Sequence, residues 1–265
     1  MFPIKDNIPT ERFPFVTVAL IAINVFVYLF LQKKSGIDFS GNSLDQSSLT
    51  HWSAIPYEFT HPGDHCDFDP TSGAIACEGQ PGVVGHADSQ PPTIVTAFTA
   101  MFMHGGLLHL GGNMLFLWIF GNNVEDSMGP VRFVIFYLLG GIAALALQIA
   151  IQPNAAVPTL GASGAIAAVL GGYILLYPRA RVLTVIFIVF FFTLIEIPAI
   201  LVLGLWFLEQ ILFGALDLTN PTGGGGGVAY FAHIGGFAAG LLLIRLFAKR
   251  TNPAYTGGGP QYPVY

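Results

Sequence analysis

The sequence predicts an all-α, polytopic membrane protein in which six apolar segments cross a bilayer as helices. Apolar residues make up 53% of the 265-residue chain and charged residues only 9%, whereas soluble proteins carry charge on about a quarter of their positions. The apolar residues also gather in runs of about 20, the length of helix that spans the hydrocarbon layer of a membrane. So little charge cannot cover a water-facing surface, which excludes an ordinary soluble domain.

The apolar runs place the helices along the chain. The first run, 13–32, is longer than a typical signal-peptide core and other runs follow it, so we interpret it as a retained helix. Pro198 divides a later run that is too long for one span. We therefore expect 182–197 to be an apolar excursion at the membrane face, although this stretch could instead span by itself. The remaining helices are expected near 105–121, 131–151, 160–177, 198–216 and 228–248.

Three regions follow from these elements. Residues 1–12 form a short N-terminal segment, 13–250 the six-helix membrane domain, and 251–265 a Gly-, Pro- and Tyr-rich tail that we expect to be disordered. The membrane domain contains one long loop, 33–92, whose Gly, Pro, Ser and Asp content predicts irregular structure. We expect short helices around 56–59 and 94–96, and a flexible connection at 220–227.

The basic residues predict the orientation, because cytoplasmic loops of membrane proteins are enriched in Lys and Arg. With the N-terminus in the cytoplasm, every Lys and Arg except Lys33 and Lys34 falls on the cytoplasmic side. A seventh span would move the basic C-terminal residues outside. We therefore expect both termini in the cytoplasm and loop 33–92 outside, in a bacterial plasma membrane.

The two cysteines, Cys66 and Cys77, both lie in the external loop. An oxidising compartment permits a disulfide there, so a Cys66–Cys77 bridge is the favoured interpretation. The alternative is a metal site that would use His61, His65 or His86, but their spacing fits no familiar zinc pattern.

Polar residues inside a membrane are costly, so each is a functional candidate. The second, fourth and sixth helices all run from outside to inside. Near their starts they carry His109 and Asn113, Ser163, and His233 respectively, with Asn113 somewhat deeper. Residues four apart share a helix face, which puts His109 and Asn113 together. The topology thus collects these four side chains in the outer leaflet.

This set of side chains predicts hydrolysis. A serine hydroxyl becomes a good nucleophile when an imidazole accepts its proton, and Ser163 and His233 could form such a pair. Asn113, His109 and the Ser163 amide could donate to a developing oxyanion. We add Gly161 as a candidate oxyanion or substrate-binding residue. No acidic residue lies nearby in the sequence, so the pair would act as a dyad.

Each residue alone has a simpler explanation. A serine in an apolar helix usually bonds to a carbonyl one turn earlier, and a lone histidine is more often a packing residue. An ion path through His104, His109, His233 and Glu209 would make the chain a transporter. Transporters, however, carry polar residues through both leaflets, whereas the inner half of this bundle is almost wholly apolar.

Three motifs together resemble the rhomboid intramembrane serine proteases of the bacterial type, over residues 95–248. Short segments at 121–126 and 177–180 are also similar to that family. The motifs are Gly161-Ala162-Ser163-Gly164, Ala232-His233-Ile234-Gly235-Gly236 followed by Gly240, and His109-Leu110-Gly111-Gly112-Asn113.

The resemblance implies a six-helix rhomboid-like bundle and a serine endopeptidase with Ser163 as nucleophile and His233 as base. It implies that His109 and Asn113 line the oxyanion hole, and that the fifth helix with 217–228 gates substrate entry. The expected partners are membrane lipid and single-pass membrane proteins, cut in or near their spans at small, helix-weak segments. No metal, other cofactor or nucleic acid is expected.

Two positions depart from the family pattern or stay unexplained. Some rhomboid proteases carry an aromatic residue one turn after the nucleophile, where this chain has Ala167, so the orientation of His233 is open. Glu209 either faces the water-filled cavity or makes a structural bond to Trp206 or a neighbouring helix; we favour the structural role, as we do for Glu125 and Arg132. A catalytically silent rhomboid-like protein that binds membrane clients is the alternative function.

Overall fold

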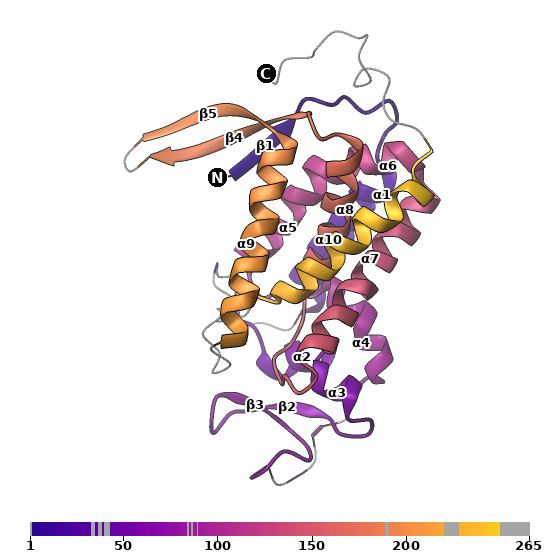
Figure 1. The fold of residues 1–265 in the computed structure, drawn as a ribbon. Coiled ribbons are helices and arrows are strands. Elements are labelled where there is room, and N and C mark those ends of the chain that lie inside the picture. The colour runs from indigo at the N-terminus through magenta and orange to yellow at the C-terminus, as the bar shows by residue number, and fades with distance from the viewer. Residues whose placement is uncertain are drawn as a thin grey trace.

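The computed structural model describes residues 2–32, 35–36, 39, 43–83, 85, 87–88, 90–188, 191–219 and 228–249. Most of these residues lie in an elongated helical bundle, with a small sheet at one end and a loop region at the other (Figure 1). The predicted flexible connection 220–227 and disordered tail 251–265 lie outside the described residues.

Each of the six predicted apolar segments contains a helix. A π-helical turn, Val27–Leu31, extends the first of them, and another, Leu117–Gly121, joins α5 to α6. The helices of the bundle are α1 (Phe15–Phe26), α4 (Thr93–Thr99), α5 (Leu107–Phe116), α6 (Asn122–Met128), α7 (Pro130–Ile151), α8 (Ser163–Leu176), α9 (Ala199–Thr219) and α10 (Tyr230–Phe247).

Within the described part of the chain, three helices, α7, α9 and α10, are long and apolar enough to cross a membrane. A fourth span results if Thr93–Phe102 and Leu107–Met128, which meet at a bend of 80°, are taken as one. Phe15–Leu31 and Ser163–Leu176 are shorter apolar helices. The fold is therefore that of a mostly helical membrane protein.

The prediction of an all-α fold was wrong at 182–197, which is neither a helix nor a span. These residues belong to β4 (Arg181–Ile188) and β5 (Phe191–Pro198), an antiparallel hairpin that pairs with β1 (Phe2–Asp6) in the order β1-β4-β5. The stretch is rich in β-branched and aromatic residues, which fit strands well. Pro198 ends β5, and α9 begins at the next residue.

Loop 33–92 is more ordered than predicted. It contains α2 (Gln46–Trp52), α3 (Pro56–Thr60) and a hairpin of β2 (Cys66–Asp69) with β3 (Ala74–Cys77). The expected short helices are confirmed in α3 and α4. The Cys66–Cys77 disulfide is also confirmed, and it joins the two strands of the hairpin across an 11-residue separation.

The loop region is fastened to the segment that leads into α8. Ala54 and Thr159 exchange backbone hydrogen bonds of 3.1 and 2.7 Å. The Thr60 hydroxyl donates to the Pro153 carbonyl at 2.6 Å. These bonds hold the chain just before Ser163 against loop 33–92.

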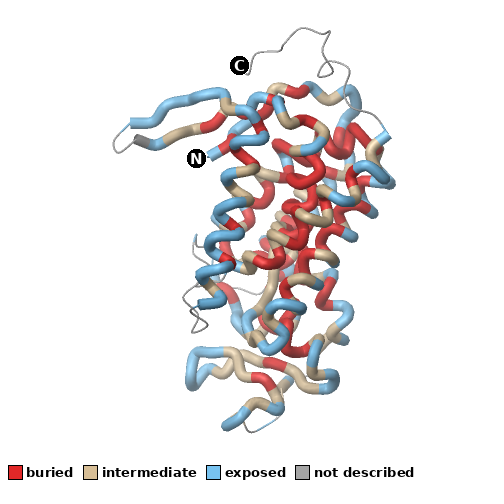
Figure 2. Tube along the Cα trace, in the orientation of Figure 1, coloured by how far each residue is buried: buried red, intermediate tan, exposed pale blue. Residues whose placement is uncertain are grey.

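Helix α8 forms the centre of the bundle, and every residue from Gly164 to Tyr173 is buried (Figure 2). Its contact with α10 depends on glycine. A methyl group at Gly236 would overlap the Gly164 carbonyl oxygen, and one at Gly240 would overlap the Ala168 carbonyl oxygen. The two backbones therefore touch directly, which brings the first turns of both helices together.

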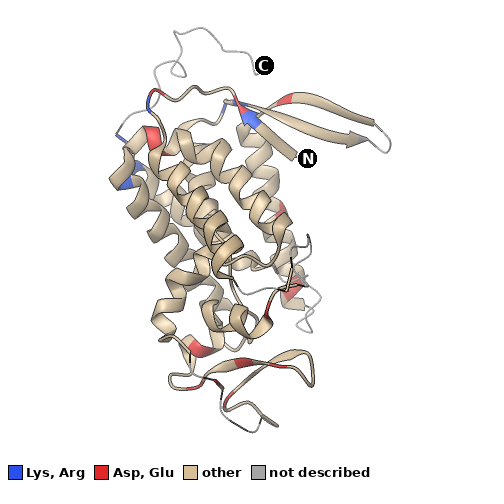
Figure 3. Cartoon of the chain, turned by 180° about the vertical axis from the view of Figure 1, so that it is seen from behind, with Lys and Arg blue, Asp and Glu red and all other residues tan. Residues whose placement is uncertain are grey.

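The two ends of the bundle differ in charge. All lysines and arginines among the described residues lie at the end that carries the N-terminus (Figure 3). The predicted structural roles of Glu125 and Arg132 at this end are confirmed. Glu125 accepts from the Val16 and Thr17 amides at 3.0 and 2.8 Å, and Arg132 donates to the Phe247 carbonyl at 3.1 Å. Both charges cap helix ends of opposite partial charge.

Candidate active site

Ser163 is the first residue of α8, and the backbone before it depends on a glycine. Gly161 adopts φ of 108°, a left-handed conformation that side-chain-bearing residues rarely take. Its amide donates to the Ala100 carbonyl at 2.8 Å. This turn brings the chain across the end of α4 and aims the Ser163 side chain into the bundle.

His233 lies in the first turn of α10, and the two predicted partners meet. Ser163 Oγ and His233 Nε2 are 2.8 Å apart, although 70 residues separate them in the sequence. Both residues are half-buried. The distance suits transfer of the hydroxyl proton to the imidazole.

The other nitrogen of the imidazole contacts a residue that the sequence analysis missed. Gln210 of α9 is buried, and its Oε1 lies 2.7 Å from His233 Nδ1. The Gln210 Nε2 group donates to the Trp206 carbonyl at 3.3 Å, which fixes the direction of the amide. An amide oxygen can only accept, so His233 carries a proton on Nδ1 and presents a free lone pair on Nε2 to Ser163.

The open question about Ala167 is answered by α9. Ala167 is buried against the α8–α10 contact, where a methyl at Gly236 would lie 3.2 Å from its Cβ. The aromatic neighbour of His233 is instead Trp206, with ring centres 5.7 Å apart and planes inclined by 36°. Trp206 and Gln210 are four residues apart on one face of α9, so this helix alone orients the imidazole.

The remaining predicted residues converge on Gly161. A methyl group there would lie 2.8 Å from His109 Nε2 and 3.4 Å from Asn113 Nδ2. Asn113 Nδ2 is buried and has no hydrogen-bond partner among the described residues. Buried polar groups are nearly always bonded, so an amide donor left over beside the serine turn is suited to an acceptor that arrives with substrate.

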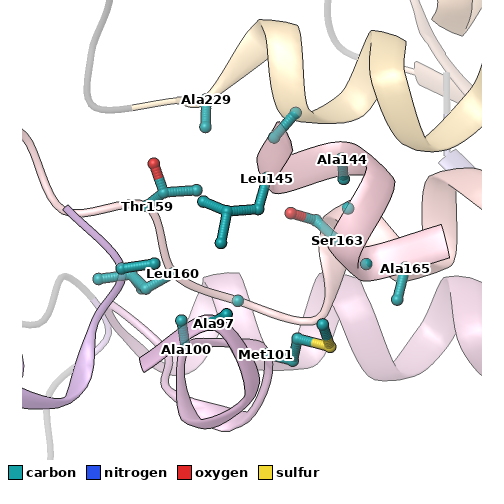
Figure 4. A pocket seen from close by; sticks show the side chains of 15 residues that line it. Ala97, Ala100, Met101, Ala144, Leu145, Thr159, Leu160, Ser163, Ala165 and Ala229 are labelled. Carbon is teal, nitrogen blue, oxygen red and sulfur yellow. The ribbon is translucent and has the colours of Figure 1, made fainter. Parts of the chain in front are cut away.

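A small cavity of about 30 Å³ adjoins the serine. Figure 4 shows Ser163 in its wall, with Leu145 and Thr159 near by. The lining is mostly of small residues, including Ala54 from loop 33–92 and Ala100, the residue that follows α4. A space of this size accepts a methyl-sized group.

A second polar chain that the sequence analysis missed joins three helices at the same end. Gln148 of α7 accepts from the Ala232 amide at 3.1 Å and donates to Gln152 at 2.6 Å. Gln152 donates in turn to Asp217 near the end of α9 at 2.9 Å. Through these bonds, α9 is tied to α7 and to the first turn of α10, one residue from His233.

Two candidates of the ion-path hypothesis have other surroundings. Glu209 is exposed on α9, so it does not line a cavity inside the bundle. Its structural bond to Trp206 or a neighbouring helix stays a prediction. The neighbouring Gln210 faces the site instead. His104 is fully buried, and its backbone amide and carbonyl bond to the Gln32 side chain at 2.9 Å each.

Fold and site together describe a helical membrane protein with a serine–histidine pair at the meeting point of three helices. The family comparison agrees: a model of the Rhomboid domain matches residues 91–250. The chain belongs to the rhomboid family.

Several curated proteins are similar over this region. Rhomboid protein 1 of Saccharomyces cerevisiae mitochondria is 30% identical over 154 residues, covering 56% of this chain and 40% of the yeast protein. RHOMBOID-like protein 4 of Arabidopsis thaliana is 34% identical over 143 residues, covering 54% of this chain and 31% of that protein. Rhomboid protease GluP of Bacillus subtilis is 40% identical over 73 residues, covering 28% of this chain and 14% of that protein. The matches thus span less than half the length of these relatives.

Proposed function

We propose that this protein is an intramembrane serine endopeptidase that cuts other membrane proteins in or near their transmembrane segments. The observation that carries the proposal is the 2.8 Å contact between Ser163 Oγ and His233 Nε2. A hydroxyl and an imidazole at this distance form the working pair of acyl-transfer enzymes. The printed name of the Bacillus relative, a rhomboid protease, supports the same class of activity.

In the first half of the reaction, Ser163 Oγ attacks the carbonyl carbon of the scissile bond and His233 Nε2 takes the hydroxyl proton. The carbonyl oxygen becomes an oxyanion. Asn113 Nδ2, the buried donor beside Gly161, is in place to bond it, and His109 and the Ser163 amide at the start of α8 contribute further donors. Collapse of the intermediate breaks the C–N bond, and His233 returns its proton to the leaving amine.

In the second half, water attacks the acyl-serine ester while His233 again accepts a proton. The proton then returns to Ser163 Oγ, and the new carboxylic acid leaves. Gln210 Oε1 accepts from His233 Nδ1–H throughout. It therefore stabilises the imidazolium that forms twice per cycle and holds the ring in one tautomer, the task that a carboxylate performs in a triad.

The cavity beside Ser163 supports small side chains next to the scissile bond. Its volume of about 30 Å³ and its lining, in which Ala and Gly outnumber the larger residues Met101, Leu145 and Leu160, favour alanine-like groups. A transmembrane helix must also unwind before its backbone can reach a serine. Helix-weak, small-residue segments of single-pass membrane proteins meet both conditions.

We further propose that the domain crosses the membrane six times, with Phe15–Leu31 and Ser163–Leu176 as short spans beside the longer ones. The basic residues at the N-terminal end support cytoplasmic termini and an active site that opens to the outside (Figure 3). A bacterial plasma membrane is part of this proposal. Labelling of single cysteines by an impermeant reagent in intact cells tests the orientation.

The test of the function compares cells that express the wild type, Ser163→Ala and His233→Ala, by quantitative proteomics of released membrane-protein fragments. We expect fragments from the wild type only. Ser72→Ala, an exposed serine of the β2–β3 turn, is the matched control and keeps wild-type release. A client that binds all variants equally and is cut by none would show a catalytically silent relative instead.

A further inference from the structure

The sheet β1-β4-β5 projects sideways from the basic end of the bundle (Figure 1). Its outer strand, β5, is exposed over most of its length, shown in pale blue in Figure 2, whereas β4 beside it is mostly half-buried or buried. The exposed fractions are high for large apolar residues: 72% at Phe187, 78% at Phe191, 70% at Phe192 and 51% at Leu194. An apolar surface this large rarely stays in contact with water.

The charge pattern of the hairpin is equally one-sided. The sequence from Val182 to Ile195 contains no charged residue. The charges that flank it, Arg181 and Glu196, stand at its base and bind one another at 3.1 Å. The hairpin therefore has an ionic base at the bundle and a neutral, apolar outer part.

Both faces of the hairpin are apolar. Phe192 pairs with Phe187 across the strands, so these two rings share one face, and Phe191 points to the other because side chains alternate along a strand. A sheet that covers the bundle or lies flat on a surface needs only one apolar face. Two apolar faces require an apolar medium on both sides.

The position of the hairpin beside α9 indicates that this apolar medium is lipid. Strand β5 runs directly into α9, a helix long and apolar enough to span a membrane, whose first turns expose Ile200, Leu201 and Leu205. The Ala199 amide donates to the Ala180 carbonyl at 2.7 Å, which holds the base of the hairpin at the end of this span. The apolar surface of the hairpin is thus continuous with the lipid-facing surface of a membrane helix.

The backbone sets the depth. Strand β5 is an edge strand, and unpaired strand edges are too costly for the hydrocarbon core. At the boundary between headgroups and acyl chains, the unpaired backbone groups of β5 can bond to water while the apolar side chains contact lipid tails. The lysines and arginines of the described residues lie at this end of the bundle (Figure 3), which suits a surface of anionic headgroups.

We propose that the β1-β4-β5 sheet is a membrane anchor, with its hairpin inserted among the lipids of the leaflet at the basic end and lipid against both faces. The anchor fixes the inner end of α9, the helix that also carries Gln210. This proposal does not depend on proteolytic activity.

The test is nitroxide labelling of single introduced cysteines, which is simple because the only two native cysteines form a disulfide. Phe191→Cys and Phe192→Cys report the two faces, and Phe187→Cys is a second reporter for the Phe192 face. The proteins are reconstituted in phosphatidylcholine–phosphatidylglycerol liposomes. Collisions with oxygen, which dissolves in lipid, are compared with collisions with a water-soluble nickel chelate. Ser72→Cys in the external hairpin is the water-exposed control.

We expect collisions with the nickel chelate to be several-fold less frequent at both hairpin positions than at Ser72→Cys, and oxygen collisions to be more frequent. Frequent nickel collisions at either hairpin face would overturn the proposal. Protection from both reagents, lost when the protein is diluted with lipid, would show that a second copy covers the sheet and would also overturn it.

Discussion

Replacement of Gln210 by methionine isolates the role of α9 in orienting His233, the proposed catalytic base. Methionine has nearly the same length and shape, but it lacks the oxygen that accepts from His233 Nδ1 at 2.7 Å. Gln210 is only 6% exposed, so water cannot take its place easily. The imidazole of His233 then lacks a partner at Nδ1. The energetic cost of the missing bond is larger once the ring is protonated to the imidazolium.

The magnitude follows from this burial. A buried donor left without a partner costs about 1–3 kcal/mol. If the loss falls on the transition state, the rate drops by about 5- to 150-fold. Gln210→Glu keeps an oxygen acceptor at the same position and gives up only the weaker bond to the Trp206 carbonyl. We expect this variant to retain most of the activity that methionine removes.

The assay is cleavage of a single-pass substrate in liposomes, with kcat and KM measured separately. We expect a lower kcat with little change in KM, because Gln210 contacts His233 and not the substrate. Glu209→Met, one residue away on the exposed face, serves as the matched control and keeps wild-type kinetics. Nitrogen-15 spectra of His233 in Ser163→Ala protein add a readout that needs no turnover. The shifted Nδ1–H signal should vanish when Gln210 becomes methionine.

Three results would refute this reasoning. Full activity of Gln210→Met would show that the imidazole needs no partner from α9. Equal losses in the methionine and glutamate variants would point to the bond with Trp206, and hence to packing of the helix. An unchanged Nδ1–H signal would show that His233 is oriented by another group.

Three further predictions concern other parts of the molecule. Burial raises the pKa of Asp6 from 3.8 to about 7, so the folded state binds this proton more tightly than the unfolded state does. The free energy of unfolding therefore declines as the pH rises between these values. The thermal unfolding temperature should fall over the same pH range in the wild type but not in Asp6→Asn. Reduction of the Cys66–Cys77 disulfide should cost the β2–β3 hairpin about 2–4 kcal/mol and expose it to limited proteolysis, while the bundle stays intact. Gln152→Leu breaks the 2.9 Å bond to Asp217 and should loosen the C-terminal end of α9, seen as faster amide exchange there but not in α7.

The helices could be predicted from the sequence because apolar runs of membrane length leave few alternatives. The proximity of Ser163 and His233 could be predicted as well, since alternate helices run in the same direction and glycines allow α8 and α10 to touch. Their catalytic roles rest on the proposal above. The sequence thus indicates that the two residues lie at a similar depth and on neighbouring helices. The structure adds the distance of 2.8 Å between Ser163 Oγ and His233 Nε2.

The hairpin and Gln210 could not be predicted so easily. An apolar run such as 182–197 fits a strand or a buried helix equally well, and its partner β1 lies about 180 residues earlier, so no local pattern marks the pairing. Glu209 attracted attention because it is charged, although the uncharged residue beside it faces the site. A signal was present: Trp206 and Gln210 are four apart, the spacing of one helix face.

The most direct test of the central claim is labelling of the purified, folded protein by a fluorophosphonate, with the modified peptide identified by mass spectrometry. The account predicts a single adduct on Ser163, abolished in Ser163→Ala, weakened in His233→Ala and unaffected by Ser72→Ala. A folded, lipid-embedded preparation that takes up no label at Ser163, or labels equally well without His233, would contradict it.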